Sequence, residues 1–417
     1  IFALFYINAS FAIAKLVKQG NLSIEISLGS ILDFANDIVA ESDVRTKLNL
    51  PVSFEEVILS NVPDYTGMLS TCVQIGPILN RQTEVPSNFR SNVLLNTGLF
   101  QNYDQYVFGS TALSVSGISR ILKQCCLEEK PDAWNDFNRW TFNKEDPVKP
   151  VTYLEFKTWI HRLFLNTVLP PARNSQAAVR EEHPNTMMLL LWVCKYCIEH
   201  LSYPIHWVTS SIESLLTNGT LKTKATIINQ SPSSVPVEGK KLKAYIISAF
   251  QLELRNQLAI CMQCDLFPHQ IISNELLPQG KIVEYYLDIE IDPLSAGGNS
   301  NFSSLGFILE KEKNRDYEIM PTGGMFGMMF GGMGGGMGFE PRVDLRGSLL
   351  QKGDRVGHLF STATYNAKLG HLSIYLCEDI FEQYSDYYVS VVRTDCWGTL
   401  DHNVVMLKNA KVSTIFD

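Results

Sequence analysis

The segment Ser60–Tyr65 has the residue types of a site that could hold an amine. It reads SNVPDY and directly follows a short apolar run, Val57–Leu59. Side-chain oxygens and a backbone carbonyl in such a turn can accept hydrogen bonds from an amino group. On this hypothesis Asn61 and Asp64 position the substrate and Tyr65 stacks on it. A rigid turn is an equally simple explanation, because Asn, Pro and Asp also shape tight turns where strands end.

Two Cys-x-x-Cys pairs offer the soft ligands that zinc prefers. They are Cys194 with Cys197 and Cys261 with Cys264. A structural zinc site needs four ligands that converge, usually on tight turns. Here the two pairs are far apart in the chain, and the first lies in LLLWVCKYCIEHL, which has the composition of a buried helix. A free Cys in such a helix packs as a small hydrophobe. We therefore predict core packing for these cysteines and no bound cofactor, with zinc as the alternative.

Composition and the remaining motifs exclude several classes of protein. The sequence contains no G-x-S-x-G, no H-E-x-x-H and no P-loop. A formal net charge of −8 argues against a broad nucleic-acid surface, which would need clustered Lys and Arg. The nine cysteines are an odd number and sit in apolar stretches, which is typical of a reducing compartment. We predict an intracellular protein of the cytoplasm or nucleus without a nucleic-acid partner.

The elements that must position the Ser60–Thr66 loop follow the order strand, helix, strand. Alternation predicts a strand at Leu22–Gly29, helical spacing predicts a helix at Ile31–Val39, and Val57–Leu59 predicts the second strand. This order is typical of a parallel sheet, where ligands bind beyond the carboxyl ends of the strands. Amino-group methyltransferases place their substrate loop there. Residues 1–111 are therefore predicted to be part of a methyltransferase-like, Rossmann-type α/β sheet, although the Gly-rich loop for S-adenosylmethionine is missing.

Residues 112–280 have a helical pattern and are predicted to be a helical insertion. Apolar residues form one stripe at Leu154, Trp159, Leu163, Phe164 and Val168. TMMLLLWVCKYCIEHL is apolar on nearly all sides, which indicates a buried helix. Further helices are predicted at Ile205–Leu216 and Ala244–Leu266.

Residues 281–417 return to strand-like patterns. GHLSIYLCEDIF and YYVSVVRTDCWG predict two strands that form an antiparallel pair near the end of the chain. Before these two strands, Met320–Phe339 is rich in Gly and Met, and glycine at that density opposes regular structure. We predict a flexible surface loop at residues 320–339, with an adaptable Met-rich contact surface as the alternative.

The first residues of the chain predict a buried helix. Residues 1–14 are apolar, but the run is shorter than the roughly 20 residues that a membrane span needs. No membrane partner is therefore expected. Because the chain opens on Ile1 instead of Met, we expect it to be a piece of a longer product.

Five segments of the chain resemble one group of proteins. They are SNVPDYTGMLS (60–70), SNVLLNTGLFQNYDQYVFGSTAL (91–113), FKTWIHRLFLNTVLPPAR (156–173), YPIHWVTSSIESLL (203–216) and VVRTDCWG (391–398). The group is the fungal, chiefly basidiomycete, MYND-finger proteins. These join a zinc finger to a large domain of unknown function, and a related domain occurs in an axonemal dynein assembly factor.

The resemblance implies a degenerate methyltransferase-like domain with a helical insertion, beside a MYND finger that binds Pro-rich peptides of other proteins. The finger itself needs about seven cysteines and a histidine within some 40 residues, a density that this chain lacks. No zinc ligand is therefore carried over. We expect a non-enzymatic protein-interaction or assembly scaffold. A methyltransferase that uses SNVPDY is the alternative, and a viral shell subunit would suit the length but not the strand–helix–strand start.

Overall fold

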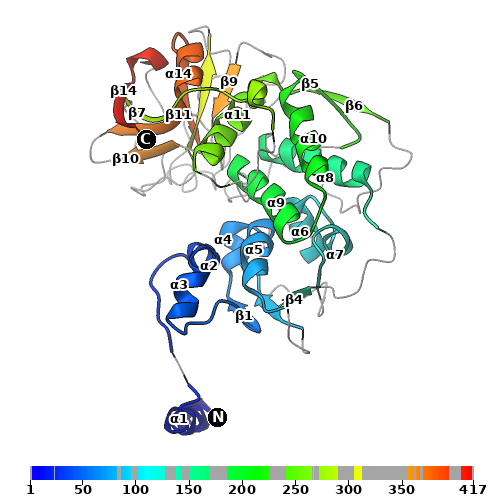
Figure 1. Cartoon of the computed structure of the whole chain (residues 1–417), viewed down its shortest axis with the longest axis vertical. Helices are drawn as coiled ribbons and strands as arrows, with labels where there is room; N and C mark the ends of the chain where they lie inside the picture. Colours follow the sequence, from blue (N-terminus) through cyan, green and yellow to red (C-terminus); the bar gives the residue numbers. More distant parts are fainter. Residues whose placement is uncertain are drawn as a thin grey trace, which may run out of the picture. The chain divides into compact units, whose positions relative to one another are not determined.

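The computed structural model of the chain contains two compact units, Ile1–Ser53 and Phe54–Asp417 (Figure 1). The residues that it describes are 2–22, 24–81, 86–94, 102–126, 138–142, 150–168, 186–225, 241–264, 266, 272–289, 305–311, 356–359, 363–366, 370–393 and 405–415. The Gly/Met-rich segment 320–339 lies outside them. The predicted domain boundaries at residues 111 and 280 stay predictions.

The first unit contains helices α1 (Phe2–Lys18), α2 (Ile31–Ala40) and α3 (Ser42–Lys47). The prediction of a helix from Ile31 is confirmed by α2. It begins after Ser30, whose Oγ accepts a hydrogen bond from the Asp33 N–H and so satisfies one of the donors left free at a helix start. Its apolar residues repeat at helical spacing and supply the buried face.

The predicted strand at Leu22–Gly29 is wrong for the described residues of that segment, which form no strand. Glu25 instead makes a bidentate ion pair with Arg45 of α3, at 2.9 Å for Nη1–Oε1 and 2.7 Å for Nη2–Oε2. Arg45 Nε also donates to the Pro51 carbonyl. The segment is therefore held by one side chain, and its alternating pattern does not reflect a sheet.

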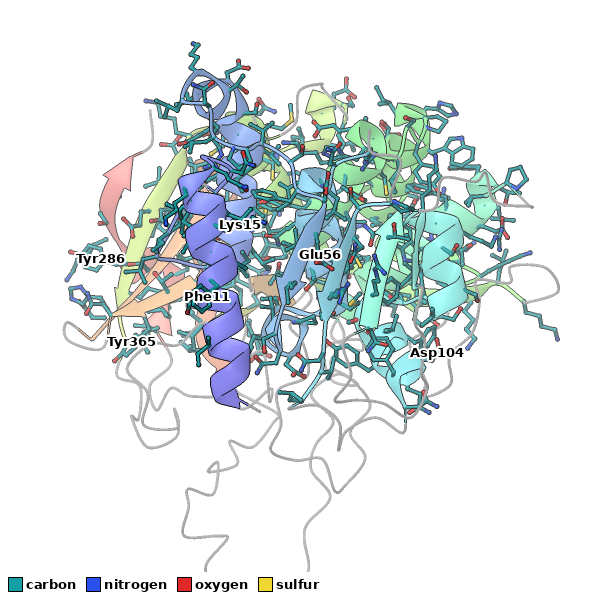
Figure 2. The ribbon with its side chains drawn as sticks, turned by 90° about the horizontal axis from the view of Figure 1, so that it is seen from below. Phe11, Lys15, Glu56, Asp104, Tyr286 and Tyr365 are labelled. Carbon is teal, nitrogen blue, oxygen red and sulfur yellow. The ribbon has the colours of Figure 1, made fainter. Side chains whose placement is uncertain are left out.

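Helix α1 has the predicted secondary structure but not the predicted burial. Its described large apolar side chains are exposed, and Phe11 is 73% exposed. Figure 2 labels Phe11 and Lys15 along this helix. Among the described residues, no helix combines the length and the apolar character needed to cross a membrane.

The second unit begins with a four-stranded mixed sheet in the order β1-β2-β4-β3. Its strands are β1 (Glu56–Leu59), β2 (Asn88–Ser91), β3 (Gln124–Cys126) and β4 (Asn138–Phe142). Only β1 and β2 are parallel here, joined through α4 (Val62–Thr66), α5 (Met68–Ile75) and the 3-10 turn η1 (Gly76–Ile78). The pairs β2–β4 and β3–β4 are antiparallel. The chain is therefore a mixed α/β protein, and the described strands form one parallel pair in place of the predicted parallel sheet.

The helical region contains α6 (Tyr103–Thr111), α7 (Val115–Ile121), α8 (Tyr153–Val168), α9 (Met187–Glu199), α10 (Ile205–Leu216) and α11 (Ser248–Gln263). The predicted helices exist, and α10 has the predicted bounds. The helix predicted at Ala244–Leu266 is shorter than predicted, because Ala244–Ile246 belong to strand β6 and α11 begins at Ser248. Helices α8, α9 and α10 pack together (Figure 1). Trp159 and Phe164 of the predicted stripe are fully buried, whereas Leu154 is exposed. The hairpin β5 (Thr220–Thr223) and β6 (Lys243–Ile246) also lies in this region, as do β3 and β4.

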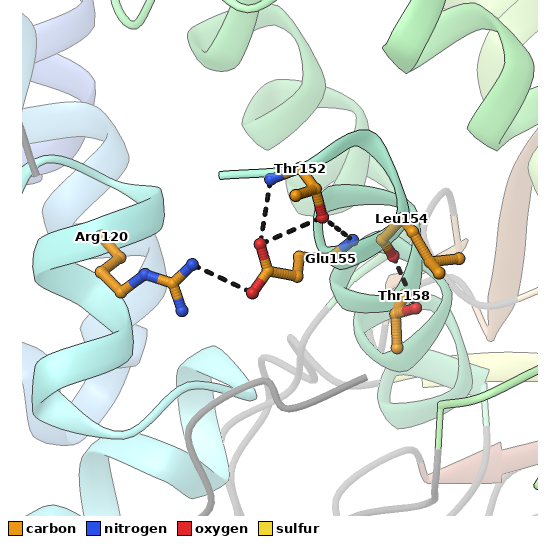
Figure 3. Close-up of polar contacts among 5 residues, drawn as sticks. All are labelled: Arg120, Thr152, Leu154, Glu155 and Thr158. Atoms are coloured by element: carbon orange, nitrogen blue, oxygen red, sulfur yellow. Dashed lines mark hydrogen bonds and ion pairs between the residues drawn. The ribbon is translucent and has the colours of Figure 1, made fainter. Parts of the chain in front are cut away.

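Helix α8 begins with a capping box that also ties it to α7 (Figure 3). The Glu155 N–H donates to Thr152 Oγ1 at 3.3 Å, and Glu155 Oε2 accepts from the Thr152 N–H at 2.9 Å. These reciprocal bonds satisfy two N–H groups at the start of the helix. Arg120 of α7 binds the other carboxylate oxygen of Glu155 at 3.0 Å. One glutamate therefore caps α8 and holds α7 against it.

Further along α8, three side chains bind the carbonyl groups at the end of α6. The pairs are Asn166 with Gly109, Trp159 with Thr111 and Arg162 with Ala112, at 3.0, 3.0 and 3.3 Å. Burial lowers the pKa of Arg162, which has no acidic partner among the described residues. The negative end of the α6 dipole and the ring of Phe108, 5.9 Å from the guanidinium carbon, compensate its charge.

Two antiparallel sheets form the last part of the second unit, in the orders β10-β11-β7-β14 and β13-β12-β8-β9. Their elements are β7 (Ile282–Asp288), β8 (Leu305–Glu310), β9 (Val356–Leu359), β10 (Ala363–Asn366), β11 (His371–Cys377), α14 (Glu378–Tyr384), β12 (Tyr388–Arg393), β13 (Val405–Met406) and β14 (Lys411–Ile415), with 3-10 turns η2 (Asn274–Leu276) and η4 (Leu407–Asn409). Buried residues of both sheets and of α11 share one hydrophobic core.

The predicted strands β11 and β12 exist, but the prediction that they pair with each other is wrong. Strand β11 pairs with β7 and β10, and β12 pairs with β8 and β13. The acidic connection between them is helix α14, which carries the chain from one sheet to the other. Both strands turn alternate apolar residues toward the shared core, which the two sheets bury between them.

Candidate functional site

The predicted loop lies at the carboxyl end of the one parallel strand pair among the described residues. Strand β1 ends at Leu59, and α4 begins at Val62 with Asn61 as its N-terminal flanking residue. Because β1 and β2 are parallel, the segments that follow them meet at the same edge of the sheet. The Asn92 N–H after β2 points to the Ser60 carbonyl at 3.5 Å. This is the placement that the sequence predicted for the loop.

Asp64 is part of the internal hydrogen bonding of this edge. It is only 6% exposed, and its Oδ2 accepts a hydrogen bond from the Leu94 N–H at 2.6 Å. The neighbouring Pro63 carbonyl accepts from the hydroxyl of Tyr106, also at 2.6 Å. Burial raises the pKa of Tyr106 well above its ordinary value, so this hydroxyl keeps its proton and stays a donor.

Asn61 and Tyr65 face outward and contact each other. Asn61 Nδ2 lies 3.4 Å from the Tyr65 hydroxyl, and Tyr65 is 61% exposed. The structure therefore brings the three predicted residues into one turn of chain but gives them different surroundings. Asp64 is buried and bonded, whereas Asn61 and Tyr65 are the ones that a molecule in solution could reach.

Sequence reasoning missed a group of buried polar atoms at the same edge. Ser91 Oγ, Asn92 Oδ1 and Asn138 Nδ2 have no hydrogen-bond partner among the described residues. Ser91 on β2 lies directly opposite Asn138 on β4, so their Cβ atoms are about 5 Å apart. A water molecule or a small neutral polar group would satisfy such atoms, because they comprise both donors and acceptors. The signal in the sequence is the Ser91-Asn92 pair, which follows Phe89 and Arg90.

The four candidate zinc ligands do not converge. Cys194 and Cys197 are fully buried in α9, and burial raises the pKa of Cys194 to about 12. Burial also raises the pKa of Cys261 to about 12, and its thiol donates to the Met188 sulfur at 3.7 Å. Cys264 is exposed at the end of α11. Metals bind the thiolate, which burial disfavours. Within the described ranges, no group of three or more His, Cys, Asp or Glu could hold a metal ion.

Comparison with known proteins adds no constraint on the fold or the function. No family model, no curated protein and no solved structure matches the chain. What the chain does must therefore be argued from its own residues.

Proposed function

We propose that this chain is a non-enzymatic scaffold that acts through contacts with other proteins. The proposal rests on the hydrogen bonds that the acceptor groups of the Ser60–Tyr65 loop already make within the protein. An amine substrate would need the Pro63 carbonyl and the Asp64 carboxylate, and these already accept hydrogen bonds from Tyr106 and from Leu94. Both residues are buried as well, so a substrate amine could reach these oxygens only if the turn moved.

Exposed apolar side chains give the scaffold proposal its second support. Helix α1 exposes several large apolar side chains to solvent. An apolar helix face is usually buried, and an exposed one is typical of a surface that contacts another protein. Free thiols in the described part of the chain support a reducing compartment, the cytoplasm or nucleus; they are Cys72, Cys194, Cys197, Cys261, Cys264 and Cys377. Membership of the MYND-finger group stays part of the proposal, and this chain would supply the accompanying domain without the finger and its zinc.

The second candidate is a methyltransferase that uses S-adenosylmethionine. The parallel pair β1–β2, with a loop beyond its carboxyl edge, supports both this activity and the finer assignment of a partial methyltransferase-like fold. Asn61 and Tyr65 are accessible for a substrate, and the unpartnered polar atoms of Ser91 and Asn138 lie at the same edge. The bonded state of Asp64 counts against it.

Calorimetric titration of the chain with S-adenosylmethionine separates the two candidates. The scaffold proposal expects no binding heat at millimolar ligand. Saturable binding of S-adenosylmethionine would overturn it. The substitution Asp64→Ala should lower the free energy of unfolding by about 2 kcal/mol, because the Leu94 N–H loses its acceptor. Tyr65→Ala should change it by less than about 0.5 kcal/mol, since this side chain is exposed.

A further inference from the structure

Strand β6 of the β5–β6 hairpin presents a row of apolar side chains to solvent. Leu242 is 66% exposed and Ile246 is 45% exposed, and Ala244 between them is exposed as well. Residues two apart in a strand share one face, so these three side chains form a single row. The opposite face of the hairpin is anchored in the unit, where Leu221 is buried.

The outer edge of β6 has backbone groups that β5 does not use. The Ile247 N–H donates to the Gly219 carbonyl at 2.7 Å, so these two residues form a hydrogen-bonded pair. In an antiparallel ladder such pairs alternate with pairs whose backbone groups point away from the partner strand. In the observed register, Ala244 and Ile246 lie in pairs of the second kind, so their N–H and C=O groups point away from β5. No other described strand pairs with β6.

The same edge is positively charged in a chain of negative net charge. Lys241 and Lys243 alternate with the apolar row along β6, and both are exposed. Lys222 lies beside Ala244 on the neighbouring strand and is also exposed. The formal net charge of the whole chain is −8, so this hairpin is a local exception. Lysines on an edge oppose pairing with a second copy of the same edge, because like charges would face each other.

We propose that the free edge of β6 binds an extended acidic segment of a partner protein by strand addition. The partner strand would place apolar residues beside Leu242, Ala244 and Ile246, and Glu or Asp beside Lys241 and Lys243. Main-chain hydrogen bonds to the edge of β6 would supply affinity, and the alternation of apolar and acidic side chains would supply specificity. This inference rests on the proposed scaffold function and names the kind of partner.

A synthetic strand tests the proposal on the full chain. The probe is a fluorescein-labelled peptide of four Glu-Val repeats, and binding is followed by fluorescence anisotropy. We expect saturable binding that weakens as ionic strength rises from about 0.05 to 0.5 M. The matched Lys-Val peptide should not bind. Absence of binding up to millimolar chain, or equal binding of both peptides, overturns the proposal.

Two kinds of variant test whether the peptide binds at the free edge of β6. Ala244→Pro removes the N–H that faces away from β5, a position where a strand tolerates proline, and should weaken binding about tenfold or more. Ala244→Thr keeps the N–H and should bind as the parent does. The charge reversal Lys241→Glu with Lys243→Glu should weaken binding about tenfold, whereas Lys18→Glu with Lys47→Glu should not. Binding that survives both edge variants contradicts the inference.

The outcomes also separate this inference from the scaffold proposal. If neither the peptide nor S-adenosylmethionine binds, the edge is not a docking site and the scaffold proposal stands. If S-adenosylmethionine binds, the scaffold proposal falls, whatever the peptide does. A dimer in analytical ultracentrifugation that Ala244→Pro dissociates would assign the edge to a second copy of the chain, which overturns the acidic partner.

Discussion

The side-chain amide of Asn256 lies beside Cys377 as though it were a residue of a neighbouring strand. Asn256 Oδ1 accepts from the Cys377 N–H at 3.0 Å, and its Nδ2 donates to the Tyr375 carbonyl at 2.8 Å. A residue of a parallel strand bonds a carbonyl and an N–H two residues apart in this manner. Gln263, farther along α11, repeats the pattern at the start of β7 by donating to Gly280 at 2.6 Å. Helix α11 is thus fastened to two adjacent strands through amide side chains.

The substitution Asn256→Asp should lower the free energy of unfolding by about 3 kcal/mol or more. The side chain is fully buried, and a carboxylate there would face the Tyr375 carbonyl without a proton to share. The matched change Gln263→Glu sits at an exposed position and should cost about 1 kcal/mol. Urea unfolding followed by circular dichroism measures both. Equal losses of unfolding free energy in the two variants would mean that the buried hydrogen bonds of Asn256 stabilise the fold no more than the exposed ones of Gln263.

The substitution Thr152→Ala should lower the free energy of unfolding by about 1 kcal/mol, because it removes the N-cap of α8. Thr209→Ala is the control, since Thr209 is a half-buried residue inside α10 and its hydroxyl, among the described residues, bonds the Ile205 carbonyl of its own helix. Alanine has the higher helix propensity, so this control should be neutral or slightly stabilising. The same urea experiment compares them. A loss in the control as large as that in Thr152→Ala would argue against a specific cap.

Local features of the chain were predictable from the sequence. Helices α9 and α10 were predictable because their apolar patterns are long, and the Ser60–Tyr65 turn was predictable because Asn, Pro and Asp act within a few residues. The N-cap of α8 is also predictable from the sequence, since Thr152 and Glu155 have capping-box spacing.

Contacts between distant residues were not predictable. Nothing in Leu22–Gly29 indicates that Glu25 binds Arg45, twenty positions along the chain, and the alternating pattern of the segment predicts a strand instead. The role of Asp64 depends on the Leu94 N–H, which only the parallel pairing of β1 and β2 brings near. Likewise, β11 and β12 are consecutive strands, but they pair with the distant strands β7 and β8 and so lie in different sheets.

The substitutions Ser91→Ala and Asn138→Leu should leave the free energy of unfolding unchanged or raise it by about 1 kcal/mol. Each removes a buried polar atom that has no partner among the described residues, and such atoms are costly to bury. Thr141→Val on β4 is the matched control, because its hydroxyl donates to the Ser87 carbonyl at 2.8 Å and its loss should cost about 1–2 kcal/mol. If Ser91→Ala were as damaging as Thr141→Val, a bound water or ligand would have to occupy this edge.

His161 is a buried histidine whose two ring nitrogens are both bonded. Nε2 lies 2.8 Å from Ser214 Oγ, and Nδ1 lies 3.0 Å from Thr223 Oγ1. Ser214 donates its own proton to the Ser211 carbonyl, so Nε2 must donate to Ser214, and Nδ1 accepts from Thr223. The neutral ring therefore fits the site. Burial, assisted by the charge of Lys157, lowers the pKa of His161 to about 3.

Stability should consequently fall as the solution is acidified below about pH 6.5, the ordinary pKa of histidine. Between pH 6.5 and pH 3 the unfolded chain binds a proton at His161 and the folded chain does not, so acid favours unfolding. At pH 5 this amounts to about 2 kcal/mol. Urea unfolding at pH 7 and pH 5 of the parent and of His161→Gln measures it, because the variant should lose about 2 kcal/mol less on acidification. His206→Gln, at an exposed position of α10, should lose as much as the parent. If His161→Gln did so as well, this histidine would not be the source of the pH dependence.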